Sequence, residues 1–218
     1  MKQVRLSVGA VLLSLAALIA GSKAALAQNI PGSVEITAIG GGYFGHQIFE
    51  NLNTKVETAT TYEYGARLGV NITEGIGIEA AWTYSKPDLN ATRLTDNGVT
   101  GTIGQLKSNA FELDGLFSLG TDAASFYVVL SAGVTTLQPE IAGIQTNSTT
   151  NFSSSAGIGG KFWFGPHFGV RAEGRWRWVI TNNTTDAGVW CDPFDVCYAY
   201  STNVYGHPDL TAGLTVRF

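Results

Sequence analysis

Apolar and polar residues alternate with a period of two along most of this chain. Between residues 168 and 180 every second position is apolar or glycine, whereas Arg171, Glu173, Arg175 and Arg177 occupy four of the six positions between them. Seven further segments show the same alternation: 34–44, 62–70, 76–84, 111–119, 126–134, 152–164 and 210–218. Successive side chains of a β-strand point to opposite faces, so this period predicts eight strands, each with one apolar face.

The two faces of these strands differ in charge. The apolar faces contain 45 residues and no charged side chain, while 12 of the 37 intervening residues are charged. Six of the twelve are acidic and six are basic: Glu35, Glu63, Glu79, Glu112, Asp114 and Glu173, and Arg67, Lys161, Arg171, Arg175, Arg177 and Arg217. Isolated charges are costly to bury, so we expect these balanced charges to pair with one another across a narrow interior.

Aromatic residues gather near both ends of the predicted strands. Phe44, Tyr62, Tyr84, Trp176 and Trp178 lie at one end, and Phe117, Phe126, Phe164, Phe168 and Phe218 lie at the other. Aromatic girdles, an apolar outside and a polar inside are typical of β-barrels that cross an outer membrane. A sheet can cross lipid only when it is closed, because unpaired backbone groups find no water there. The pattern therefore predicts an all-β fold, an eight-stranded antiparallel up-and-down barrel.

The lengths of the connections between these strands alternate as well. Residues 71–75, 120–125 and 165–167 form short turns, whereas 45–61, 85–110, 135–151 and 181–209 form long loops. Outer-membrane barrels have short periplasmic turns and longer extracellular loops, so both termini are expected in the periplasm. Asn97-Gly98 is a hairpin signal, and we expect residues 92–102 to form a hairpin that protrudes from the membrane.

Composition and charge favour an exported chain. Only 14% of the 218 residues are charged and 27 are glycine, which excludes a disordered chain and favours strands over helices. Two basic residues, an apolar run over 8–20 and Ala25-Leu26-Ala27 predict a signal peptide over 1–27, followed by a barrel domain over 28–218. The net charge of −4 excludes a basic footprint for nucleic acid.

Two segments carry a resemblance to a known family. Residues 214–218 (LTVRF) resemble the alternating, Phe-ended strand that the barrel-assembly machinery recognises, and residues 168–175 resemble the penultimate strand of such barrels. The chain resembles the small eight-stranded outer-membrane β-barrel superfamily that includes the OmpA membrane domain, the OmpX/Ail type and the opacity proteins. The resemblance implies a bacterial outer-membrane location, Phe218 as an assembly signal, and lipids, periplasmic chaperones and the assembly machinery as partners. It implies no shared catalytic residues.

Candidate reactive residues are few. Cys191 and Cys197 are separated by five residues in the longest loop, and an oxidising compartment favours a disulfide between them. A redox-catalytic CxxC pair is not present. His207, with Ser201 and Asp209 nearby, could form a hydrolase triad like that of outer-membrane lipid deacylases, but a histidine at a strand end is the simpler interpretation. The three dispersed histidines do not predict a zinc site, and no cofactor is indicated.

Three functions remain open at this point. The first is a non-enzymatic scaffold that displays four loops for adhesion, contact with a host or partner, or envelope integrity. The second is a small porin-like channel, and the third is an outer-membrane lipid-modifying enzyme. The interior of an eight-stranded barrel is just wide enough for side chains to fill it, and the twelve charges with Tyr127 and Trp163 are expected to do so. The sequence therefore favours a plugged scaffold.

Overall fold

A computed structural model describes residues 30–51, 54–93, 99–120, 123–141, 144–145, 147–180, 189–191, 197–199 and 204–218. The predicted signal peptide over 1–27 lies outside these residues. Every regular element in the described part is a β-strand. None of the described residues forms a helix long and apolar enough to cross a membrane.

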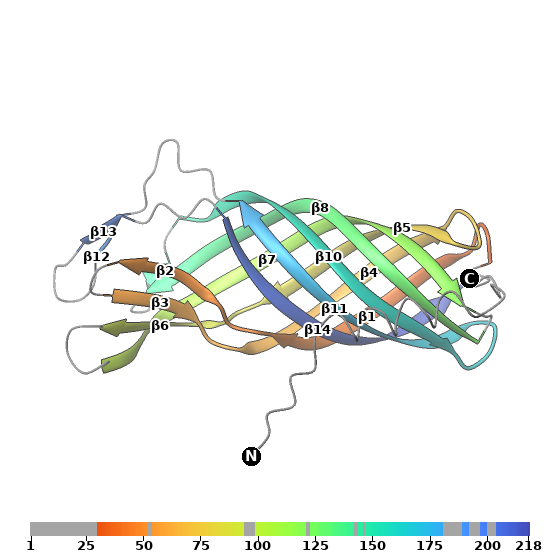
Figure 1. The fold of residues 1–218 in the computed structure, drawn as a ribbon, viewed down its shortest axis with the longest axis horizontal. Coiled ribbons are helices and arrows are strands. Elements are labelled where there is room, and N and C mark those ends of the chain that lie inside the picture. Colours follow the sequence, from red (N-terminus) through yellow and green to blue (C-terminus); the bar gives the residue numbers. More distant parts are fainter. Residues whose placement is uncertain are drawn as a thin grey trace, which may run out of the picture.

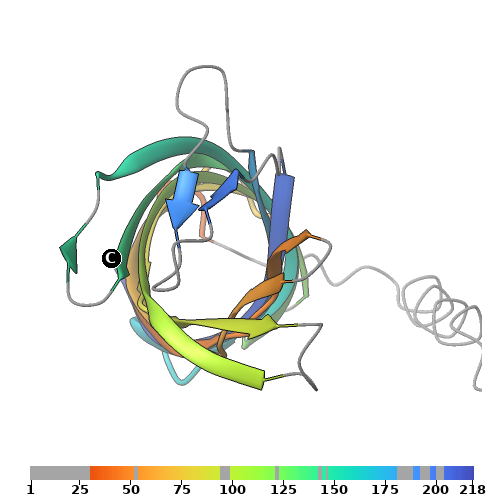
Figure 2. The ribbon, with the colours of Figure 1, turned by 90° about the vertical axis from the view of Figure 1, so that its left-hand side faces the viewer.

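Eight long strands form a closed ring. They are β1 (Val34–Tyr43), β4 (Thr61–Asn71), β5 (Ile76–Ser85), β7 (Val99–Gly120), β8 (Ala124–Ile141), β10 (Thr149–Trp163), β11 (Phe168–Ile180) and β14 (Val204–Arg217). Each pairs antiparallel with the next in this order, and β14 pairs with β1, with Glu35 opposite Arg217. Figure 1 shows the tilted strands and Figure 2 shows the ring end-on. The predicted eight-stranded antiparallel barrel is confirmed.

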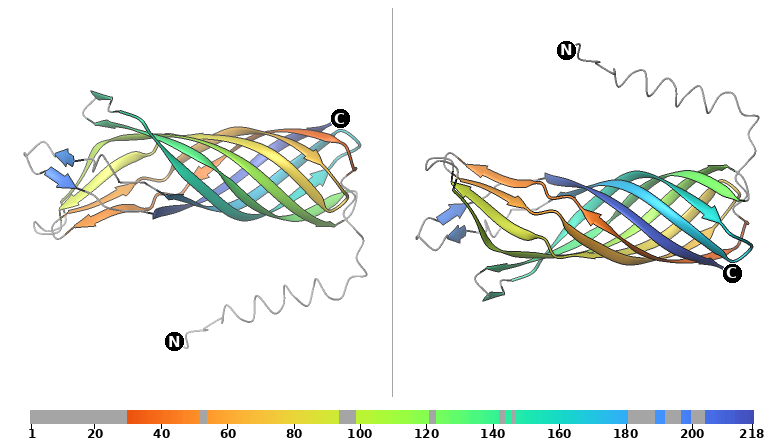
Figure 3. Two further views of the ribbon diagram at one scale, coloured as in Figure 1. Left: turned by 90° about the horizontal axis from the view of Figure 1, so that it is seen from above. Right: turned by 90° about the horizontal axis from the view of Figure 1, so that it is seen from below.

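The first and last strands meet at the end of the barrel that carries the short turns (Figure 3), which we name the terminal end. There the amide of Val34 donates to the carbonyl oxygen of Phe218 at 3.1 Å, and the amide of Phe218 donates to that of Val34 at 2.9 Å. The turn between β10 and β11 contains Gly165 with φ of 142°, a conformation that glycine adopts without steric cost. The opposite end, with the longer connections, is the loop end.

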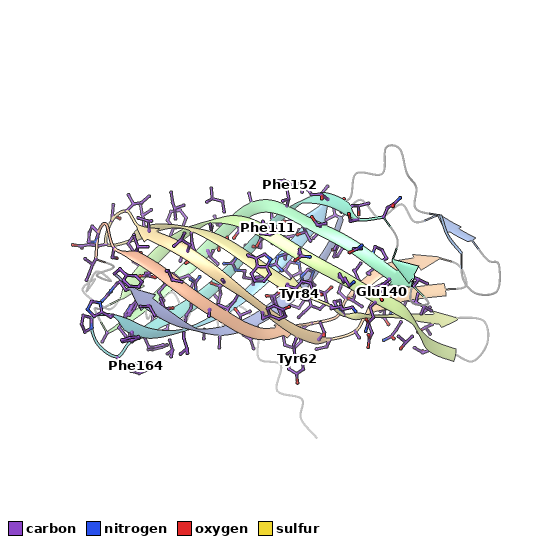
Figure 4. The ribbon with its side chains drawn as sticks, turned by 180° about the vertical axis from the view of Figure 1, so that it is seen from behind. Tyr62, Tyr84, Phe111, Glu140, Phe152 and Phe164 are labelled. Atoms are coloured by element: carbon purple, nitrogen blue, oxygen red, sulfur yellow. The ribbon has the colours of Figure 1, made fainter. Side chains whose placement is uncertain are left out.

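A band of apolar side chains surrounds the barrel between its two ends. It consists of the outward-facing residues of the eight segments that the alternation predicted, and we name it the apolar band. Leu130 is 54% exposed whereas its neighbour Ser131 is buried, so β8, the strand with the least polar inner face, has the predicted phase. In Figure 4, Tyr84 and Phe111 lie near the border of the band toward the loop end, and Phe164 lies at the terminal end.

The four long connections contain more strand than the sequence analysis predicted. Residues 45–61 include β2 (Gln47–Asn51) and β3 (Thr54–Thr58), and residues 85–110 include β6 (Asp88–Arg93) and the first half of β7. β8 continues to Ile141, before β9 (Ile144–Gln145), and β12 (Val189–Cys191) pairs with β13 (Cys197–Ala199). The predicted hairpin over 92–102 is formed by β6 and β7, with Thr92 opposite Thr100. Its turn at 94–98 lies outside the described residues.

The reason for this difference is an inversion of polarity beyond the apolar band. On β8 the outward face changes from Val134 to Thr136, while the inward side chain of Leu137 is buried. On β7 Lys107 faces outward and Leu106 is buried inside. The sequence analysis recognised a strand by its apolar face, and this face becomes polar beyond the apolar band. It therefore predicted a loop for the rest of each strand.

Candidate functional site

The interior of the barrel, or lumen, is the candidate functional site. All twelve charged residues of the polar strand faces are buried there. They project from β1, β4, β5, β7, β10, β11 and β14, whereas β8 contributes Tyr127 and Ser131 to the interior. We name the buried charged residues the lumen charge network. Because charges are costly to bury unless they are paired and hydrogen-bonded, their geometry determines what the lumen can do.

Glu173 on β11 is the centre of the lumen charge network. Its carboxylate accepts hydrogen bonds from Arg67 Nη1 at 2.8 Å and from Arg171 Nη2 at 2.6 Å, and it also pairs with Arg175 Nε. The hydroxyl of Tyr127 donates to the same carboxylate at 2.7 Å. Charge-assisted hydrogen bonds are stronger than neutral ones, so three arginines and one hydroxyl together offset the cost of burying this carboxylate.

Arg171 connects this centre to the opposite wall of the barrel. Its Nη1 donates to both carboxylate oxygens of Glu79 on β5, at 2.9 and 2.7 Å, and its Nε donates to the hydroxyl oxygen of Tyr127 at 2.6 Å. Tyr127 can reach this position because residue 159 is glycine. A Cβ atom at Gly159 would lie 2.2 Å from the Tyr127 hydroxyl oxygen, so a larger residue there would displace the tyrosine.

Two further arginines continue the network toward the loop end. Arg175 pairs with Asp114 at 2.5 Å and with Glu112 at 3.4 Å. Arg177 lies 3.3 Å from Glu112, 3.4 Å from Glu63 and 2.9 Å from Asp209. Since Glu112 contacts both arginines, the ion pairs form a continuous chain along β11 rather than separate couples.

The terminal end of the lumen contains a smaller group. Lys161 pairs with Glu35 at 2.5 Å, and Asn71 Nδ2 donates to the other oxygen of Glu35 at 2.7 Å. The guanidinium of Arg217 lies 4.1 Å from the ring centroid of Trp163, a cation–π contact. Among the described residues Arg217 therefore packs against an aromatic ring, apart from the central ion pairs.

Sequence reasoning missed two residues of the lumen, Asp209 and His207. It predicted that the last strand begins at Leu210, whereas β14 begins at Val204. His207 Nε2 lies 3.4 Å from Asp209 Oδ1, and with Asp209 the described lumen contains seven carboxylates and six Lys or Arg side chains. The inward positions of this strand recur every second residue, so extending the pattern from Thr211 toward the N-terminus would have placed Asp209 and His207 inside. Ser201, the third member of the hydrolase triad considered above, lies outside the described residues.

An apolar cluster packs across the lumen at the loop end, beyond the charge network. It consists of Leu89, Leu106, Leu137, Val179 and Tyr205, which come from β6, β7, β8, β11 and β14, and Ile48 and Ile103 pack against it. We name it the loop-end cluster. Its side chains fill the interior where the strand faces have inverted, so the interior is apolar there and charged in the central part of the lumen.

The remaining predicted site residues lie outside the lumen. Cys191 and Cys197 are opposite each other in the β12–β13 pair. Directly opposed residues of antiparallel strands have Cα atoms about 4.5–5.5 Å apart, within the range that a disulfide spans; the bond itself stays a prediction. The side chain of Phe218 is 71% exposed at the terminal end, so it extends the apolar band to the last residue.

Comparison with known proteins places this closed ring in a family. Residues 13–217 match the outer membrane protein beta-barrel domain. The chain belongs to this family of outer-membrane β-barrels. Its apolar band is therefore the surface that faces lipid, and the segments of the eight strands within the band are the membrane-spanning segments. No curated protein sequence matches the chain.

Three solved structures share the barrel fold. Neisserial surface protein A (NspA) has 13% sequence identity and a TM-score of 0.59, and the match covers 86% of this chain and 97% of that one. OprG from Pseudomonas aeruginosa has 10% identity and a TM-score of 0.55, with 88% and 99% covered. Ail, the attachment invasion locus protein of Yersinia pestis, has 13% identity and a TM-score of 0.50, with 87% and 100% covered. At these identities the similarity concerns the fold alone.

Proposed function

We propose that this outer-membrane barrel is a non-enzymatic scaffold with a plugged interior, whose loop end serves adhesion, contact with a host or partner, or envelope integrity. The observation that carries this proposal is the filled lumen. An ion crossing the barrel would have to break buried ion pairs around Glu173 and then pass the loop-end cluster. Both steps are costly, because the first uncovers buried charges and the second removes water from the ion.

The length of the strands supports a role for the loop end. A membrane-spanning β-strand needs about 9–11 residues, whereas β7 has 22 residues and β8 has 18. The excess carries the sheet beyond the lipid, and the loop-end cluster gives this part an apolar core. Because short turns are periplasmic in such barrels, the terminal end belongs in the periplasm, and the loop end is a platform at the cell surface.

The surroundings of His207 support a non-enzymatic role. The side chain is 1% exposed, and the ring centroids of Tyr43 and Tyr205 lie 4.3 and 6.1 Å from it. A general base has to come within hydrogen-bond distance of its substrate, which this burial prevents. We expect purified protein and a His207→Ala variant to show the same background in assays of lipid deacylation in vesicles. Activity that disappears only in the variant would favour the enzyme.

Conductance in planar bilayers tests the plug. The wild-type barrel should give no steady ohmic conductance, whereas a variant that combines Arg175→Ala with Leu106→Ala and Leu137→Ala should give measurable current. The triple variant shows that the assay detects this barrel when it is opened. A stable ohmic conductance of the wild type, unchanged by these substitutions, would replace the scaffold with the channel.

Labelling of intact cells tests the orientation. A short epitope inserted at 94–98 should be reached by antibody without permeabilisation, while the same epitope at 121–122 should be reached only after it. Replacing the residues at 94–98 and 181–188 by Gly-Ser segments of equal length should then reduce adhesion to host cells while barrel assembly is unchanged. Labelling at 121–122 alone in intact cells would reverse the orientation and end the surface-platform proposal.

We propose that Cys191 and Cys197 form a disulfide that fixes the β12–β13 ribbon. Native exported protein should resist alkylation at both cysteines until a reductant is added. Replacing both by serine should leave assembly intact, because the ribbon pairs only with itself among the described strands. Alkylation of both thiols without reductant would exclude the bond.

We propose that Phe218 is the assembly signal. Its backbone closes the ring against Val34, so deleting the residue would remove hydrogen bonds as well as the side chain. Phe218→Ala keeps these hydrogen bonds and should still lower the yield in the outer membrane. Phe168→Ala, at the same end and also exposed, is the matched control and should assemble normally. Equal yields for the two variants would contradict the proposal.

A further inference from the structure

The outer wall of the barrel carries a pair of lysines at the border of the apolar band. Lys86 follows β5 two residues after Tyr84, and Lys107 lies on β7 four residues before Phe111. The two strands are neighbours and pair Ser85 with Ser108, so the two lysines adjoin. Their side chains are 34% and 23% exposed. They therefore face outward just beyond Tyr84 and Phe111, the apolar outward residues of these strands that lie nearest the loop end.

One carboxylate holds both ammonium groups. Glu140 Oε2 lies 3.4 Å from Lys86 Nζ and 3.2 Å from Lys107 Nζ. A hydrogen bond from Lys107 and the charges of both lysines lower the pKa of the Glu140 carboxyl, so the group stays ionised and the three residues carry a net charge of +1. Figure 4 shows Glu140 beyond Tyr84 and Phe111, toward the loop end.

The position of this pair differs from that of the other cations. Among the Lys and Arg side chains that the structure describes, six are buried in the lumen. Lys55, Lys86 and Lys107 face outward, and Lys55 forms an ion pair with Glu57 at 2.5 Å. Two of these three outward-facing cations therefore share one site at the border of the apolar band. Two neighbouring ammonium groups repel each other, and the carboxylate of Glu140 offsets this repulsion.

We propose that Lys86 and Lys107 bind a phosphate group of an outer-leaflet lipid, the phosphomonoester of lipid A. Lipid phosphates lie just outside the hydrocarbon, level with this pair, and lysine binds phosphate as a point charge. Glu140 holds the two ammonium groups at one place, and its own charge limits the affinity. This inference rests on the proposed orientation, which places the loop end and hence the lysine pair in the outer leaflet.

The test measures binding of fluorescent lipid A to the purified barrel in zwitterionic detergent by anisotropy. A basic residue near a charged membrane surface contributes about a fivefold change in affinity. Lys86→Gln and Lys107→Gln should therefore each weaken binding about fivefold, while Glu140→Gln should strengthen it about fivefold, because the net charge rises. Lys55→Gln, an outward lysine away from the border, should leave affinity unchanged.

Two competitors identify the source of the phosphate. Lipid A should bind more tightly than dephosphorylated lipid A by about the factor that the double variant Lys86→Gln/Lys107→Gln loses. Inorganic phosphate should compete only weakly, since it lacks the acyl chains that pack on the apolar band. Equal binding of dephosphorylated lipid A, equal binding by all variants, or tight binding of inorganic phosphate alone would each overturn the proposal.

The epitope labelling described above separates this inference from the proposed function. If residues 94–98 are labelled on intact cells and the lysine variants bind lipid A normally, only the phosphate site is wrong. If the labelling reverses, the orientation fails and the lysine pair belongs to the inner leaflet. Resistance of the barrel to detergent unfolding without boiling serves as the folding control for each variant, and Glu140→Gln retains both lysines if a lysine variant does not fold.

Discussion

The two halves of strand β7 follow opposite rules of polarity. Within the apolar band, Leu113 faces outward and Glu112 faces the lumen, whereas beyond the band Lys107 faces outward and Leu106 is buried inside. The backbone pairing of β7 stays the same where the polarity of its two faces inverts. The register with β8 continues from Gly104 opposite Ile141 to Gly120 opposite Ser125 without a shift.

This comparison shows that the surroundings of a strand, rather than its pairing, decide which side chains face inward. In lipid the outer face has to be apolar, so polar residues remain for the interior and pair there. In water the same sheet buries apolar side chains, because removing them from water is favourable. One barrel is thus stabilised by ion pairs in its membrane half and by an apolar core in its loop-end half.

The largest difference between the halves should appear when a charge is removed. Glu173→Gln leaves Arg67, Arg171 and Arg175 without their shared carboxylate, and breaking a buried pair costs about 3–5 kcal/mol. Glu57→Gln makes the same change in the partly exposed Lys55–Glu57 pair, where about 1 kcal/mol or less is expected. Urea unfolding followed by tryptophan fluorescence in detergent measures both. Equal losses would mean that the lumen network does not stabilise the barrel.

The second largest difference between the halves is expected for a charge introduced on the outward face. Leu113→Arg places a cation in the apolar band, which costs about 2–4 kcal/mol near the bilayer midplane. Asn109→Arg introduces the same cation on the same face of this strand, four residues nearer the loop end. It lies beyond the apolar band, so it should cost little. Yield of folded protein in lipid vesicles reports the difference. Similar yields would place the membrane border elsewhere on β7.

The alternation identified the barrel and the twelve charges because lipid enforces one apolar face over every spanning strand. The pairing of those charges was not predictable, since Glu79 meets Arg171 across the lumen only in the observed register. Tyr127 was expected to fill space, but its role in the network depends on Gly159, which a single sequence does not connect to it. Asp209 was missed because the start of the last strand was placed at Leu210, six residues after its start at Val204.

The loop end should respond to loss of apolar volume instead of charge. Leu137→Ala removes a buried side chain from the loop-end cluster, and we expect a loss of about 2–3 kcal/mol, within the range for buried leucines. Leu130→Ala, on the lipid face of the same strand, should cost about 1 kcal/mol or less. Limited proteolysis should show faster cleavage beyond the band in Leu137→Ala only. Faster cleavage in both variants would indicate that the loop end has no core of its own.

The smallest effect should come from the one surplus acid of the lumen. Seven carboxylates face six Lys or Arg side chains, and Asp209 lies where Arg177 is already shared with Glu63 and Glu112. Asp209→Asn keeps the shape of the side chain and leaves Arg177 two carboxylates, so no charge is left unpaired. Stability at neutral pH should be unchanged or raised by up to about 1 kcal/mol, opposite in sign to Glu173→Gln. A loss as large as that of Glu173→Gln would show that Asp209 is an essential partner of Arg177.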